Sequence, residues 1–91
     1  MLEIKRSEVL KRAIEAYGHK AQYLCAAEEC AELIQAICKH VNRGASQKDV
    51  IEEAADVFIM LSQVVEMSGE QAVQRVVDEK LARLEERLNN A

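Results

Sequence analysis

The sequence predicts an all-α fold of four helices, and three observations support this prediction. The 91 residues include no proline, the residue that most disrupts a helix. Hydrophobic residues make up 49% of the chain, too large a share for a disordered protein, and they recur at helical spacing. Gly18, Gly44 and Gly69 divide the chain into four segments, and glycine is the usual residue just past a helix end.

The three glycines set the expected bounds of the helices. The first helix is predicted over residues 4–17, the second over 20–43, the third over 47–68 and the fourth over 70–89. Ser46 is the expected N-cap of the third helix, because a serine side chain accepts a hydrogen bond from the first turn. Short valine pairs in the third and fourth segments lie within helical periodicity and do not predict strands.

The second helix has an apolar arc and an acidic edge. The arc consists of Ala26, Ala27, Cys30, Ile34, Ile37, Cys38 and Val41. Glu29 lies near one edge of this arc and Glu32 lies roughly opposite its centre, which favours a solvated acidic face. The alternative is close approach of another helix over this face, because the small residues Cys25 and Ala36 lie beside the two glutamates.

The third helix is apolar on most sides, which predicts that it is largely buried. Asp56 is flanked on this helix by Ile59, Met60 and Met67, so Asp56, and to a lesser degree Glu53, is expected in a mostly apolar setting. An unpaired buried charge is unfavourable. These carboxyl groups must therefore bind a metal, pair with cations or be protonated.

Two pairs of carboxylates suggest a metal site. Glu29 and Glu32 are three residues apart, as are Glu53 and Asp56, and residues at this spacing share a helix face. If the two faces meet, the charges repel, by roughly 3 kcal/mol for two charges about 5 Å apart. Oxygen donors alone favour Mg²⁺ or Mn²⁺, and such metal sites usually act on phosphates. The alternative is an ordinary glutamate-rich helix surface.

A di-iron carboxylate site is the competing type of metal site, and it requires Glu-x-x-His motifs. The residues three positions before His19 and His40 are Ala16 and Ile37, so neither histidine belongs to such a motif.

The composition excludes several classes of function. A net charge of −4 does not favour binding to nucleic acid polymers. Three cysteines without a C-x-x-C motif favour small buried side chains in a reducing compartment over disulfides or zinc. The longest apolar run, residues 57–61, is too short to span a membrane, and residues 1–7 do not resemble a signal peptide. We therefore expect a cytoplasmic protein without membrane contact.

The fourth helix combines an apolar stripe with a row of cations. The stripe consists of Val73, Val77, Leu81, Leu84 and Leu88. Lys80, Arg83 and Arg87 follow one another at helical spacing. This row is either a solvated helix edge or a phosphate-binding surface.

The paired motif E-E-x-x-E and E-E-x-x-D resembles that of the MazG-like nucleoside triphosphate pyrophosphohydrolases. The motif occupies residues 28–32 and 52–56, and the likeness covers most of the chain. The resemblance implies an all-α, four-helix MazG-like bundle over a single domain, residues 1–91. It also implies assembly as a homodimer or a dimer of dimers (a homotetramer), in which a partner subunit completes each active site. Tyr23 is expected in the core.

The resemblance also implies the reaction and its metal. Glu29, Glu32, Glu53 and Asp56 match the carboxylates that hold Mg²⁺ in the family, with Mn²⁺ as a possible substitute. The substrate would be a nucleoside triphosphate, cleaved between the α- and β-phosphates into a monophosphate and pyrophosphate. Glu28 matches the first acid of the motif and would support the ligands or act as the base, so Glu28, Glu29 and Glu53 are the expected catalytic residues.

The expected substrate contacts come from two other helices. Lys80 matches a cationic position of the family, and Arg83 follows one turn later; both would stabilise negative charge on the phosphates. Leu84 stands where many members have asparagine, so the phosphate contacts depart from the family pattern. Gln22 lies on the same side of its helix as Glu29 and would bind the base; the alternative is an exposed glutamine.

Two other functions are compatible with this sequence. One is a non-catalytic helical interaction module whose acidic residues form a solvated or partner-binding surface. The other is an enzyme resembling phosphoribosyl-ATP pyrophosphohydrolase, although the chain looks closer to the MazG-like members.

Overall fold

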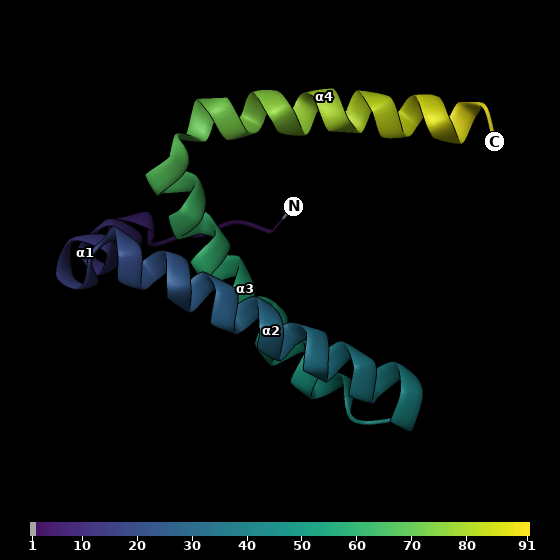
Figure 1. Cartoon of the computed structure of the whole chain (residues 1–91), viewed down its shortest axis with the longest axis horizontal. Coiled ribbons are helices and arrows are strands. Elements are labelled where there is room, and N and C mark those ends of the chain that lie inside the picture. Colours follow the sequence, from purple (N-terminus) through teal and green to yellow (C-terminus); the bar gives the residue numbers. More distant parts are fainter. Residues whose placement is uncertain (1) are drawn as a thin grey trace.

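The computed structural model describes residues 2–91, which form four α-helices in chain order (Figure 1). These are α1 (Ser7–Tyr17), α2 (His19–Arg43), α3 (Gln47–Ser68) and α4 (Glu70–Asn89). No strand occurs among the described residues, so the predicted all-α class is confirmed. The bounds of α3 and α4 agree with the prediction, and α2 begins one residue earlier. The predicted start of the first helix at residue 4 was wrong, because the helix begins at Ser7.

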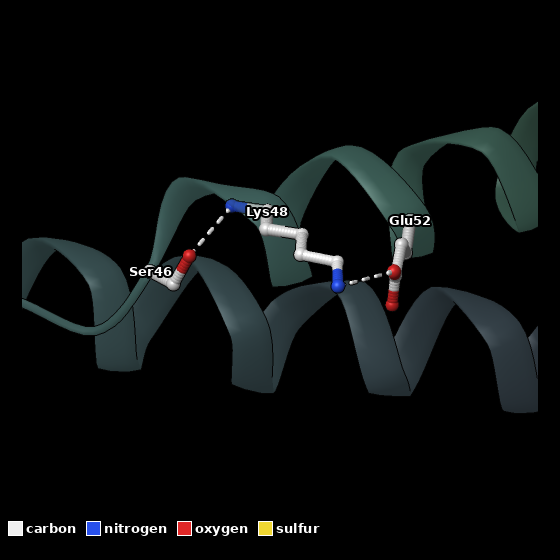
Figure 2. Close-up of polar contacts among 3 residues, drawn as sticks. All are labelled: Ser46, Lys48 and Glu52. Atoms are coloured by element: carbon white, nitrogen blue, oxygen red, sulfur yellow. Dashed lines mark hydrogen bonds and ion pairs between the residues drawn. The ribbon is translucent and has the colours of Figure 1, made fainter.

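The loop between α2 and α3 reverses the chain direction within a few residues. Gly44 ends α2 in the left-handed region, at φ 69°, and the Ala45 N–H donates to the Lys39 carbonyl at 3.1 Å. The Ser46 hydroxyl then accepts a hydrogen bond from the Lys48 N–H at 3.0 Å, which confirms the predicted N-cap (Figure 2). One turn later, Lys48 Nζ lies 3.9 Å from Glu52 Oε1 (Figure 2). These local bonds return α3 along α2 as an antiparallel pair.

The helix pair α2–α3 is the centre of the fold, and α1 packs against both of its members. The core is small, because Ile14 and Ala36 are the only buried apolar residues among those described, and each is still 8% exposed. The helix α4 contacts α3 alone and projects away from the other helices (Figure 1). The described chain therefore contains four helices, but α4 does not close a bundle with the other three.

The side of α2 that packs against α3 is not the side that its apolar arc predicts. Its apolar arc does not face α3, since Ile34 and Val41 are 62% and 72% exposed. The opposite side of the helix, which includes the buried Ala36, packs against the neighbouring helices. The alternative of close helix approach over small residues is therefore correct at Glu29, which is half-buried, whereas Glu32 is exposed as a solvated acidic face predicts.

Three further burial predictions were wrong, and the first is that of small buried cysteines, since Cys30 and Cys38 are exposed. Tyr23 is exposed rather than in the core, and its hydroxyl lies 3.2 Å from Ser68 Oγ at the far end of α3. Asp56 is exposed rather than surrounded by apolar side chains. The reason for the difference at Asp56 is that α3 is covered on only part of its circumference by α1 and α2, which leaves Ile59 exposed as well. No helix within residues 2–91 combines the length and the hydrophobicity that a membrane span requires.

Candidate metal centre

The antiparallel packing of α2 and α3 brings acidic side chains from both helices together. Glu29 of α2 and Glu53 and Asp56 of α3 each place one carboxylate oxygen within 4.8 Å of the other two. Glu29 and Glu53 are half-buried, whereas Asp56 is exposed. Three of the four carboxylates that the sequence assigned to a metal are therefore neighbours in space.

The fourth carboxylate, Glu32, is exposed but belongs to the same electrostatic cluster. Burial raises the pKa of the Glu29 carboxyl above its ordinary value of 4.5, and the negative charges of Glu32 and Asp56 raise it further. The pKa of Glu53 is raised by burial and then by the charge of Glu32, with a contribution from Asp56. Since each raised pKa depends on acids from both helices, the four residues form one acidic cluster.

Two oxygen atoms in this cluster have no protein partner. Glu29 Oε2 and Glu53 Oε2 are buried, and neither has a hydrogen-bond partner among the described residues. Leaving a buried carboxylate oxygen without a donor or a cation is unfavourable. The ion pairs found within residues 2–91 are Lys11–Glu66 and Lys48–Glu52, and neither supplies a cation to the unpartnered oxygens.

The donor set fits a hard divalent cation. All the donors in the acidic cluster are carboxylate oxygens, which Mg²⁺ and Mn²⁺ prefer over softer ligands. Mg²⁺ binds oxygen at about 2.0–2.1 Å, so two oxygens on one ion lie at most about 4.2 Å apart. The observed limit of 4.8 Å needs only a small inward movement of the side chains to meet this geometry.

The predicted base and phosphate-binding residues lie in different places. Glu28 is exposed on α2 directly before Glu29. Lys80 and Arg83 are exposed on α4 and are not near the acidic cluster of their own chain. Glu53 lies about 22 Å along α3 from Ser68, and Lys80 lies about 15 Å beyond the start of α4. Because α4 makes no contact with α2 in residues 2–91, the chain alone does not join these cations to the acids (Figure 1).

Gln22 is buried at the interface of α2 and α3, so the alternative of an exposed glutamine was wrong. Its side-chain N–H donates to Gln63 Oε1 at 2.6 Å, and Gln63 in turn donates to Met60 Sδ at 3.5 Å. Little of Gln22 is accessible to a nucleotide base in this arrangement. Sequence reasoning did not single out Gln63, although the polar pair Ser62 and Gln63 within an otherwise apolar stretch was a signal for it.

Comparison with known protein families agrees with the motif. A family model described as the MazG nucleotide pyrophosphohydrolase domain matches residues 17–91. The chain belongs to the MazG family. The matched range includes all four residues of the acidic cluster and the whole of α4, whereas most of α1 precedes it. Searches of curated proteins and of solved structures found no significant match.

The raised pKa values predict how the stability of the metal-free MazG domain changes with pH. The folded state keeps protons on Glu29 and Glu53 at pH values where the unfolded chain has released them. The free energy of unfolding therefore decreases as the pH rises above 4.5 and through the folded-state pKa values. We expect the Tm of the metal-free protein to fall over this range, and to fall less in a Glu29→Gln/Glu53→Gln variant. Identical pH curves of Tm for the two proteins would contradict the prediction.

Proposed function

We propose that this MazG family member is a Mg²⁺-dependent nucleoside triphosphate pyrophosphohydrolase, a hydrolase that takes part in control of the nucleotide pool. It would add water to a nucleoside triphosphate, break the bond between the α- and β-phosphates, and release a monophosphate and pyrophosphate. The observation that carries the proposal is the acidic cluster with its two unpartnered oxygens, formed by the paired motif of the matched family.

The roles of the acidic residues follow from their positions. Glu29, Glu32, Glu53 and Asp56 would hold the cation, which neutralises the phosphates and lowers the pKa of a water molecule. Glu28 is the best candidate for the base that accepts the proton of this water, because it is exposed and adjacent to Glu29. Glu52 is the other adjacent acid, but Lys48 lies 3.9 Å from it and offsets its charge.

The remaining surface supports a proposal about assembly. The exposed arc of α2 and the exposed stripe of α4, where Leu81 and Leu88 are 58% and 67% exposed, leave much apolar area open to water in a chain with a small core. A second copy of the chain is the proposed cover, in a homodimer or homotetramer. Because Lys80 and Arg83 lie far from their own acidic cluster, they would reach the cluster of a partner and bind phosphates there.

Metal-dependent melting separates the enzyme from a non-catalytic interaction module. A specific cation site raises the Tm as the free Mg²⁺ or Mn²⁺ concentration exceeds its Kd. We expect a rise that saturates with either ion, and a much smaller one in Glu53→Gln. A small and similar response to every divalent salt, equal in the wild type and the variant, would favour an acidic surface without a metal site.

A further inference from the structure

The hydrogen bond between Gln22 and Gln63 is a second feature of the α2–α3 interface that requires an explanation. The two side chains are 5% and 3% exposed, and they are the only buried polar side chains among the described residues. Their bond is short, at 2.6 Å, and joins residues 41 positions apart. The other side-chain hydrogen bond between these helices joins the hydroxyls of Tyr23 and Ser68; it is longer and exposed.

Each glutamine lies the same number of residues from an acid of the cluster on its own helix. Gln22 lies two helical turns before Glu29 on α2, and Gln63 lies two turns after Asp56 on α3. Because the two helices run in opposite directions, the register that places Gln22 against Gln63 also places Glu29 against Asp56.

Charge repulsion between the acids of the two helices opposes the observed register when no cation is bound. Sliding one helix by a turn, about 5.4 Å, would separate these acids. Ala36 is the only buried apolar side chain of α2, so apart from the short loop over residues 44–46, few buried apolar contacts oppose such a slide. The slide would, however, leave two buried amide groups without partners, which is unfavourable.

We infer that Gln22 and Gln63 are positioning residues whose hydrogen bond fixes the α2–α3 register in which Glu29 and Asp56 share one divalent cation. This inference rests on the cation site of the proposed function. Packing alone does not explain why two amides are buried here, because two apolar side chains of similar size would fill the same space. A role in fixing the register does explain it. A single buried polar pair is a known means of fixing the register of packed helices.

The test compares the wild type with the double variant Gln22→Met/Gln63→Met, which removes both amides together and keeps the side-chain volume. Replacing both partners of a buried hydrogen bond with apolar groups is nearly neutral for stability. We expect an unchanged or higher Tm of the metal-free protein and an affinity for Mn²⁺ that is lower by about tenfold, measured by direct titration with Mn²⁺ alone. The control variant Tyr23→Phe/Ser68→Ala removes the exposed hydrogen bond of the same interface, and should bind Mn²⁺ as the wild type does.

The outcomes separate this inference from the proposal on which it rests. A wild type that binds no Mn²⁺ would overturn the cation site and the positioning role together. Equal Mn²⁺ affinity in the wild type and the methionine variant would overturn the positioning role alone. If the variant also showed a changed preference for the nucleotide base, Gln22 would be assigned to the substrate instead. If the double variant does not fold, Gln22→Asn keeps an amide but shortens its reach, and it should also weaken Mn²⁺ binding.

Discussion

Replacing Glu53 with glutamine, or Asp56 with asparagine, is expected to reduce pyrophosphate release by at least about a hundredfold while the helical fold is kept. An amide is neutral and cannot supply the anionic oxygen that a hard cation requires. The Glu53→Gln change also removes one of the negative charges that raise the pKa of Glu29. Without metal, this variant should therefore be at least as stable as the wild type. Activity at saturating Mg²⁺ and the Tm without metal provide the two readouts.

The control for this experiment is Glu15→Gln, which neutralises an exposed acid on α1 outside the acidic cluster. The Glu15→Gln variant should keep full activity. This result would show that the loss of one negative charge anywhere on the chain does not by itself reduce pyrophosphate release. Full activity in both Glu53→Gln and Asp56→Asn would contradict the assignment of these residues to the cation.

Mixing two inactive variants is expected to restore activity if α4 serves the acidic cluster of a partner. Glu53→Gln lacks a carboxylate of the cluster, and Lys80→Ala/Arg83→Ala lacks the cations of α4. In a mixed dimer, the cluster of the second variant would receive an intact α4 from the first. Unfolding and refolding the two chains together in equal amounts should give about a quarter of the wild-type activity, because half the dimers are mixed and each has one complete site.

The refolding experiment also tests the alternative arrangement. If α4 folds back onto its own acids, every site in a mixed dimer is defective, and the mixture is as inactive as its components. A mass measurement confirms that mixed oligomers have formed. An inactive mixture that contains mixed oligomers would therefore contradict the proposed contribution of Lys80 and Arg83 in trans.

The helices were predictable from the sequence because their ends carry local signals. Ser46 and the glycines at positions 44 and 69 act within one turn of the backbone, so the bounds of α3 and α4 agree with the prediction. The convergence of Glu29 with Glu53 and Asp56 was predictable for the same kind of reason, since i,i+3 spacing defines a face and a short loop makes two faces meet.

The burial pattern was not predictable, because an apolar arc does not identify the surface that covers it. Ile34 and Val41 indicated a buried face of α2, yet α3 packs on the other side of that helix. The stripe of α4 gave an equally clear signal, but this helix leaves the rest of the chain (Figure 1). Gln22 was misjudged because its partner, Gln63, is distant in sequence and only tertiary packing brings them together.

The most direct test of the proposed function is pyrophosphate release from a panel of canonical and modified nucleoside triphosphates, first with Mg²⁺ and then with EDTA. We expect pyrophosphate and the matching monophosphate in equal amounts, lost on addition of EDTA and restored by excess Mg²⁺. The ranking of the panel would then identify the substrate class. A folded, metal-loaded protein that releases no pyrophosphate from any of these nucleotides would contradict the proposed reaction.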